Sequence, residues 1–223
     1  MKTIFGWTAG VLVLGATLST HGGLIAAWTL ENNTTADLAG GISIDAPNGG
    51  MTYNPSGVTG TLTGAGGASM ATGGAGVNSL NDPRTTPFDS ANVIYAGPNN
   101  LLTIKLNNVA GLSGFIVQYA AHDTLSGTQG WQWSTDNISW ANPYSSTLSL
   151  GGSWSVNTVD FSSASGSTLY FQNTVNSGFG YAAFDNFTVT AVPEPINYAL
   201  AAFGLCVGGI SFGRRFVRKL TRA

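Results

Sequence analysis

Charged side chains are scarce in this sequence, and their distribution is uneven. Lys, Arg, Asp and Glu make up 8% of the 223 residues, whereas about a quarter is usual for a globular domain. Between Trp28 and Val192 the cations are Arg84 and Lys105, against nine acids, which gives this stretch a net charge of −7. Nucleic acids and anionic lipids are bound through clustered cations. The composition therefore argues against a nucleic-acid partner.

Cysteine and histidine are nearly absent. The single cysteine, Cys206, lies in an apolar run near the C-terminus, so the stretch before that run has no disulfide. About 165 residues can bury a sizeable core without such cross-links. His21 and His122 are the only histidines, and this count excludes a transition-metal site built from histidine and cysteine.

Residues for catalysis are equally few. A Ser-His-Asp triad would have to use His122, beside Asp123, and the sequence contains no nucleophile elbow. Glycoside hydrolysis needs two carboxyl groups across a cleft. Glu31 is the only glutamate between Trp28 and Val192, and the spacing of the aspartates picks out no pair. We therefore predict a protein that is not an enzyme, with glycoside hydrolysis as the remaining enzymatic alternative.

Apolar segments are present at both ends. Lys2 precedes the apolar run Ile4–Leu18, and small residues follow it, which is typical of a secretory signal peptide. We assign residues 1–23 to a signal-peptide helix. Near the other end, the 18-residue apolar run 196–213 is followed by Arg214 and Arg215 within a basic tail, 214–223. About 17 to 25 such residues span a bilayer, and the dense arginines would hold that end in the cytoplasm.

The triplet Pro193-Glu194-Pro195 stands immediately before this apolar run. The succession of triplet, apolar span and Arg/Lys cluster resembles the PEP-CTERM sorting signal, which we assign to residues 192–223. The resemblance implies that a membrane-embedded exosortase recognises and cleaves near the triplet. It also implies export by the secretion machinery, anchoring in the membrane before processing, and release to the cell surface or an extracellular matrix linked to polysaccharide production. The alternative is an ordinary C-terminal anchor with a positive flank.

Residues 24–191 show apolar alternation with period two, and we find no convincing amphipathic helix among them. About ten short strands separated by turn signals predict an all-β domain, an antiparallel β-sandwich or jelly roll. The Gly-rich part, about 40–80, is expected to contain loops, with short strands at 41–44 and 58–62. The remaining expected strands are 24–31, 92–95, 102–106, 115–119, 131–134, 138–140, 147–150, 153–161, 168–173 and 180–190. Two hairpins are expected: one turns at Asp136-Asn137, and the other joins 147–150 to 153–161 across Gly151-Gly152.

Three short segments extend the resemblance to the domain itself. Ala26-Ala27-Trp28-Thr29-Leu30-Glu31, Trp133-Ser134-Thr135-Asp136-Asn137 and Phe184-Asp185-Asn186-Phe187-Thr188-Val189 look like the opening strand, a turn and the closing strand of PEP-CTERM domains. The resemblance implies a jelly roll of the kind that carbohydrate-binding modules also use.

Two candidate sites follow. Glu31 and Asp185 lie on the first and last strands, which are often neighbours in a jelly roll, and the two could supply oxygens to a structural Ca²⁺. The alternative is that Asp185 and Asn186 form a turn bonded to their own backbone.

Trp140 and Tyr144 are candidate contacts for a sugar ring, whereas Trp131 and Trp133 share one strand face and are expected to be buried. The predicted function is an exported surface or matrix protein, and the alternative is a carbohydrate-binding module of the exopolysaccharide matrix.

Overall fold

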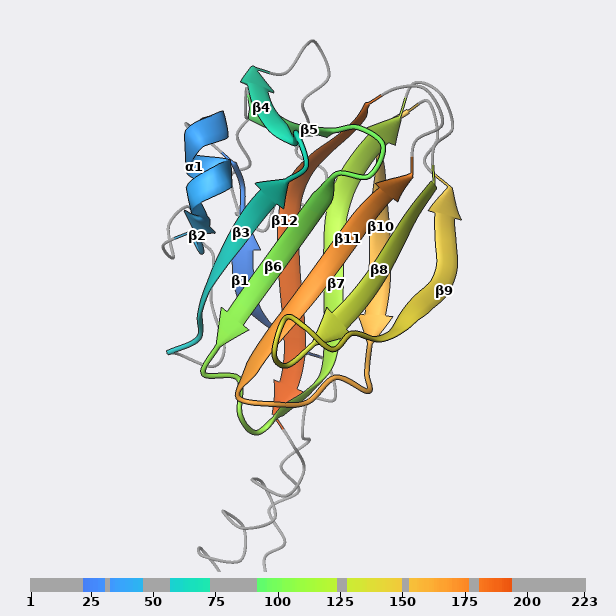
Figure 1. Ribbon diagram of the computed structural model, residues 1–223. Coiled ribbons are helices and arrows are strands. Elements are labelled where there is room, and N and C mark those ends of the chain that lie inside the picture. Colours follow the sequence, from blue (N-terminus) through green and yellow to red (C-terminus); the bar gives the residue numbers. More distant parts are fainter. Residues whose placement is uncertain are drawn as a thin grey trace, which may run out of the picture.

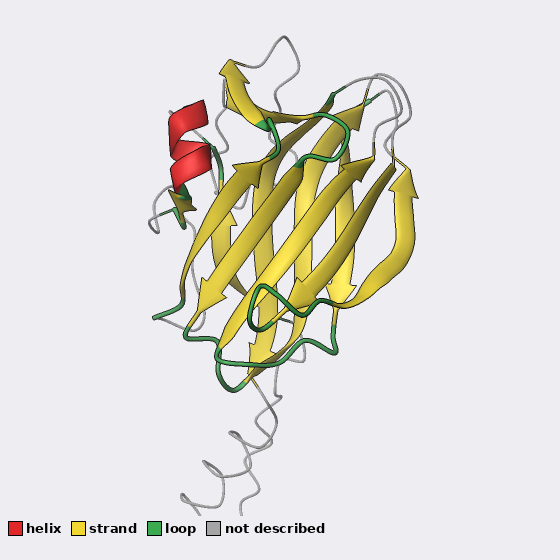
Figure 2. Ribbon diagram, in the orientation of Figure 1, coloured by secondary structure: helices red, strands yellow, loops and turns green. Residues whose placement is uncertain are grey.

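The computed structural model describes residues 22–30, 33–45, 57–72, 92–123, 128–149, 153–176 and 181–193. These residues form two antiparallel β-sheets that pack face to face (Figures 1 and 2). Sheet A contains β1 (Gly23–Trp28), β4 (Ser69–Thr72), β5 (Asn92–Ala96), β7 (Leu112–Asp123), β10 (Ser155–Phe161) and β12 (Ala182–Pro193). Sheet B contains β2 (Ile42–Ser43), β3 (Thr59–Ala65), β6 (Leu101–Asn107), β8 (Thr128–Ser134), β9 (Ala141–Ser149) and β11 (Thr168–Asn176).

The strand order is that of a jelly roll. Strands β5 to β12 pair first with last, as β5–β12, β6–β11, β7–β10 and β8–β9. This nesting places β10-β7-β12-β5 in sheet A and β6-β11-β8-β9 in sheet B, the two four-stranded layers of an eight-stranded jelly roll. The predicted antiparallel sandwich is therefore confirmed. β1 pairs with the part of β12 that follows its pairing with β5, β4 adds to β5, and β3 and β2 extend sheet B beyond β6.

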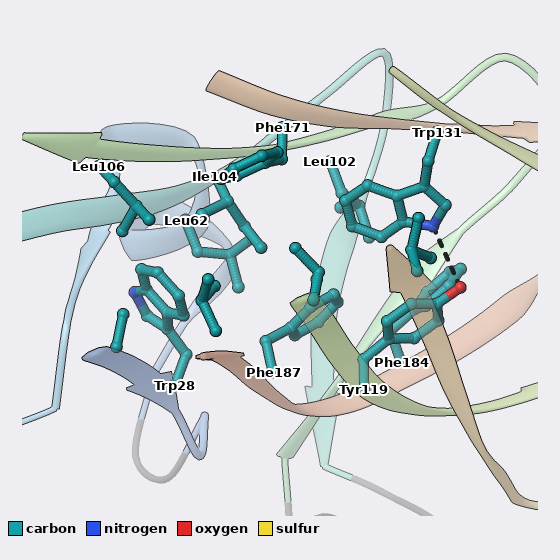
Figure 3. Close-up of a cluster of buried hydrophobic side chains, with 14 of the residues drawn as sticks. Trp28, Leu62, Leu102, Ile104, Leu106, Tyr119, Trp131, Phe171, Phe184 and Phe187 are labelled. Carbon is teal, nitrogen blue, oxygen red and sulfur yellow. Dashed lines mark hydrogen bonds between the residues drawn. The ribbon is translucent and has the colours of Figure 1, made fainter. Parts of the chain in front are cut away.

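Alternating apolar residues build the core, as the period-two pattern predicted. Leu102, Ile104 and Leu106 of β6 are fully buried, and they share one core cluster with the buried Phe115, Val117 and Tyr119 of β7 in the opposite sheet. Figure 3 shows this layer, with Trp28 at one end and Trp131 at the other. Burying such side chains contributes about 1.5–3 kcal/mol each, so the layer is the main source of the sandwich's stability.

Three strand predictions were wrong in detail. The first strand ends at Trp28 rather than Glu31, because Leu30 has a φ of 61°, outside the extended region. The strand expected at 138–140 belongs to a turn, and the returning strand β9 begins at Ala141. The expected hairpin across Gly151-Gly152 does not form, because β9 pairs with β8 in sheet B whereas β10 pairs with β7 in sheet A.

The described part of the Gly-rich region, 40–45 and 57–72, is more regular than predicted. Gly66 and Gly67, both with positive φ, turn the chain between β3 of sheet B and β4 of sheet A. The short helix α1 (Thr35–Gly40), which the sequence analysis missed, packs against β3 and buries Leu38. A reciprocal capping box begins it, in which the Thr34 side chain accepts from the Asp37 N–H and the Asp37 carboxylate accepts from the Thr34 N–H at 2.8 Å.

The last strand also differs from the prediction. β12 continues to Pro193, which pairs with Leu112 of β7, whereas the sequence predicted that the strand ends at residue 190. The helices expected at 1–23 and 196–213 lie outside the described residues, apart from Gly22 and Gly23. Within the described ranges the structure has no helix with the length and apolar character needed to span a membrane.

Candidate functional site

The outer face of sheet B carries two rows of side chains in register. Because paired residues of neighbouring strands share a face, Thr61, Lys105 and Tyr170 form one row across β3, β6 and β11. Thr63, Thr103, Gln172 and Gln132 form the second row, which reaches β8. All seven side chains are half-buried, so part of each is accessible to a ligand. We call these seven residues the polar face; it looks toward the viewer in Figure 1.

Hydrogen bonds fix the second row in place. The Gln132 amide donates to Gln172 Oε1 at 2.8 Å, and the Gln172 amide donates to the Thr103 hydroxyl at 3.2 Å. An amide has two donor hydrogens and an oxygen with two lone pairs, so each bond uses only part of its capacity. The row therefore presents preorganised donors and acceptors, which lowers the ordering cost of binding a hydroxylated ligand.

The first row adds an aromatic ring and a positive charge. Lys105 Nζ lies 5.7 Å from the centre of the Tyr170 ring, within cation–π range. The lysine stem and the tyrosine ring give this row an apolar surface beside the amides of the second row. Apolar ring faces and hydrogen-bonding amides together match a sugar, which has C–H faces and a rim of hydroxyl groups.

Charge is segregated between the two sheets. Lys105 is the only Lys, Arg, Asp or Glu in the six described strands of sheet B. The strands of sheet A carry Asp123, Asp160 and Asp185 and no cation. The polar face therefore differs electrostatically from a domain whose overall charge is negative.

Neither residue of the predicted aromatic pair belongs to the polar face. Trp140 is half-buried at the end of the turn before β9, and Tyr144 pairs through its backbone with Trp131; the Tyr144 side chain lies outside the described part. Trp131 is buried, as predicted, and Trp133 is half-buried against the core.

Asp136 organises the turn that precedes Trp140. Its Oδ1 accepts the N–H groups of Ser139 at 2.7 Å and Ile138 at 2.8 Å, and the hydroxyl of Ser134 at 2.8 Å. These bonds, the one from the Ser139 backbone first, hold the pKa of the Asp136 carboxyl well below its usual value. The turn is thus a rigid structural feature built on one carboxylate.

Asp185 occupies an irregular point of β12. Phe184 pairs with Ile94 of β5, whereas Phe187 pairs with Trp28 of β1, so two strands share this edge of β12 with Asp185 and Asn186 between them. The register with β7 shifts here, and Asn186 has a φ of 48°. Asp185 is fully buried, and its Oδ1 accepts the Asn186 N–H at 2.8 Å. This is the local turn bond expected as the alternative to a calcium site.

The other proposed calcium ligand, Glu31, lies outside the described residues. β1 and β12 are neighbours as expected, and β1 ends three residues before Glu31. Asp45 lies near the same end of β1, where its carboxylate accepts the N–H and hydroxyl of Thr29 at 2.6 and 2.8 Å. Carboxylate oxygens are of the type that Ca²⁺ prefers. The described residues contain no group of three or more His, Cys, Asp or Glu placed to hold a metal ion.

The remaining predicted residues fall into two groups. His122 of β7 packs against Trp154, with ring centres 5.6 Å apart, so its ring has a packing role. Of the sorting residues, Pro193 is the last residue of β12, and Glu194, Pro195, Arg214 and Arg215 lie outside the described residues.

The polar face was not predicted. The alternation of Tyr170 and Gln172 with Leu169 and Phe171 shows which side chains of β11 face outward. It does not show that β11 pairs with β6, which brings Tyr170 beside Lys105.

No protein-family model matches the chain, and no curated protein matches it. Among solved structures, it is similar to the CBM22-1 xylan-binding domain of Paenibacillus barcinonensis Xyn10C, at 11% identity and a TM-score of 0.43 over 60% of this chain and 86% of that chain. The CBM22-1-CBM22-2 tandem domain of the same protein matches at 11% identity and a TM-score of 0.48, over 78% of this chain and 46% of that chain.

The enzymatically active domain of a bacteriophage CBA120 tailspike protein matches at 13% identity and a TM-score of 0.43, over 66% of this chain and only 21% of that one. At these scores and identities, the matches transfer neither a ligand nor an activity.

Proposed function

We propose that this chain is an exported polysaccharide-binding protein and that the polar face is its binding surface. The observation that carries the proposal is the two-row arrangement of that face, with the Tyr170 ring beside the hydrogen-bonded Gln132–Gln172–Thr103 row. The ring contacts the C–H face of a sugar, and the amides bond its hydroxyl groups. A face of this kind runs across four strands, β3, β6, β11 and β8, so it suits a chain of sugars rather than one sugar.

Affinity gel electrophoresis in the extracellular polysaccharide of the producing cell tests this proposal. The wild type should be retarded, and the double variant Tyr170→Ala/Gln172→Ala should bind at least about tenfold more weakly, a loss of roughly 1.4 kcal/mol. The matched control is Gln118→Ala/Thr158→Ala. Its residues form an equivalent amide–hydroxyl bond of 3.1 Å on sheet A, with Gln118 half-buried and Thr158 exposed, so this variant should bind like the wild type.

A second double variant, Trp140→Ala/Tyr144→Ala, tests the site that the sequence predicted. If its retardation is lost while that of Tyr170→Ala/Gln172→Ala persists, the turn before β9 is the binding site and the polar face is not. If the wild type migrates equally with and without the polysaccharide, the proposed function is wrong.

We also propose that an exosortase processes the chain at Pro193-Glu194-Pro195, as the resemblance to PEP-CTERM signals implies. One structural observation supports this. Pro193 is both the first residue of the triplet and the last of β12, so cleavage after it would leave the described strands whole. Mass spectrometry of the mature protein from its producing cell should find a C-terminus near the triplet. An intact 214–223 tail on the mature protein would count against processing.

A further inference from the structure

The polar face has one charged group, and its position is central. Lys105 lies on β6, between Thr61 of β3 and Tyr170 of β11, with which it is in register. The neighbouring strands supply hydroxyl, amide and phenol groups but no carboxylate. Lys105 makes no ion pair with any residue that the structure describes, and its ammonium lies over the Tyr170 ring.

From this arrangement we infer, on the basis of the proposed function, that the polysaccharide carries acidic sugars and that Lys105 pairs with their carboxylate groups. A sugar that covers Tyr170 also covers the lysine and removes part of its hydration. Desolvating an ammonium is costly unless an anion compensates it. A uronate unit satisfies all three groups together: its C–H face contacts the tyrosine ring, its carboxylate pairs with Lys105, and its hydroxyls bond the amide of Gln172.

The negative charge of sheet A does not cancel this attraction. The acids of sheet A lie in the other layer, about 10 Å from sheet B, and the Debye length at physiological ionic strength is about 8 Å. Asp136 is bonded to Ser134, which pairs with Tyr170 at the far end of the first row. Its carboxylate stays charged, but the Ile138 and Ser139 N–H groups hold it in the turn after β8, and β8 is two strands away from β6, which carries Lys105.

One lysine also limits the kind of anion. Nucleic acid is bound through many cations along its backbone, and the six strands of sheet B offer a single one. A carboxylate on some sugar units of an otherwise hydroxylated chain matches one ammonium among amides and hydroxyls. The face therefore favours a uronate polysaccharide over a polyphosphate.

The experiment compares the producing cell's polysaccharide in its native form and after chemical reduction of its carboxyl groups, which converts uronates to neutral sugars and leaves the linkages unchanged. The wild type should bind the reduced polymer about tenfold more weakly. Lys105→Gln should bind the native polymer about tenfold more weakly than the wild type does. It should bind the native and the reduced polymers equally. Lys105→Arg, which keeps the charge, should bind nearly as the wild type does, and thermal melts should show that all variants are folded.

The outcomes separate this inference from the proposed function. Equal binding of the wild type to both polymers, or no loss with Lys105→Gln, overturns the role of the carboxylate while the polysaccharide site stands. A sulfated polymer would keep its charge through the reduction, so undiminished binding to it also counts against a carboxylate. Retention by Tyr170→Ala/Gln172→Ala equal to that of the wild type overturns the site itself.

Discussion

Trp131 of sheet B donates its indole N–H to the phenolic oxygen of Tyr119 in sheet A, at 3.1 Å (Figure 3). Both side chains are buried, and their ring centres are 5.3 Å apart. Nearby, the buried Asn173 amide donates to Gln129 Oε1. The Trp131–Tyr119 bond thus joins the two sheets directly through the core, where most contacts are apolar.

The first prediction concerns this bond. Tyr119→Phe leaves the indole N–H without its acceptor, and an unsatisfied buried donor costs about 1–3 kcal/mol. Trp131→Phe should cost more, because it also opens a cavity. In the double variant both hydrogen-bonding groups are gone, so neither is buried without its partner. The stability losses of the two single variants should therefore not add, and the coupling energy between the two sites should be about 1 kcal/mol. Urea unfolding of all four proteins measures the cycle, and strictly additive losses would show that the bond contributes nothing.

A second prediction is a loss of stability at high pH. Burial raises the pKa of Tyr119 above its ordinary value of about 10, and this effect exceeds the lowering by its bond with Trp131. The unfolded chain therefore releases this proton at a lower pH than the folded chain does. Stability from this group is complete below pH about 10, and it falls by up to about 1.4 kcal/mol per pH unit above it. Urea titrations between pH 8 and 11 should show a steeper decline for the wild type than for Tyr119→Phe, and parallel declines would contradict the assignment.

The third prediction concerns the turn at Asp136, whose carboxyl pKa is lowered by the Ser139 and Ile138 N–H bonds. A lowered folded-state pKa gives stability that is present above the unfolded-state value, about 3.9, and that is lost as the pH falls through the folded-state value. The carboxyl resonance of Asp136 should therefore titrate below about 3.9, the ordinary value of an aspartate. Asp136→Asn should flatten the acid dependence, and a titration of Asp136 at the usual value would argue against the turn as described.

The sequence predicted the elements better than their partners. Buried residues at every second position marked β6 and β7 correctly, because one face of each strand lies in the core. The same period-two pattern did not show which strands pair with each other. Gly151-Gly152 has suitable hairpin chemistry, yet β9 and β10 lie in different sheets, since a jelly roll pairs strands that are distant in the sequence. The helix α1 was missed because six residues are too few to show a helical period.

The candidate site has the same limit. Local alternation places Lys105 and Tyr170 on the outer faces of their own strands, but only the β6–β11 register makes them neighbours. The sequence favoured Trp140 and Tyr144 as sugar contacts and expected Trp131 in the core, where its ring lies. Alternation along one strand separates inward from outward rings, but it does not show which outward ring lies beside the amides of a neighbouring strand.

The last prediction is that Ca²⁺ stabilises the protein through Glu31 and Asp185. Asp185 is buried at the point where β5 and β1 meet along β12, so a bound cation there would tie three strands together. Ligand binding to the folded state alone adds about 2.7 kcal/mol when free Ca²⁺ is 100 times its Kd, which is several degrees in Tm for a domain of this size. Thermal melts in EDTA, and then in excess Ca²⁺, should show this rise in the wild type.

Two substitutions make the calcium test specific. Asp185→Asn keeps the shape of the side chain and an oxygen for the Asn186 N–H but removes the charge, so it should abolish the rise in Tm. Asp160→Asn is the matched control, because Asp160 is an exposed aspartate of β10 whose Oδ1 accepts the Ser162 N–H at 2.7 Å. This control should respond to Ca²⁺ as the wild type does. A wild-type Tm that is the same in EDTA and in Ca²⁺ would show that calcium does not stabilise the protein. Asp185 would then serve only as the acceptor of a local turn bond.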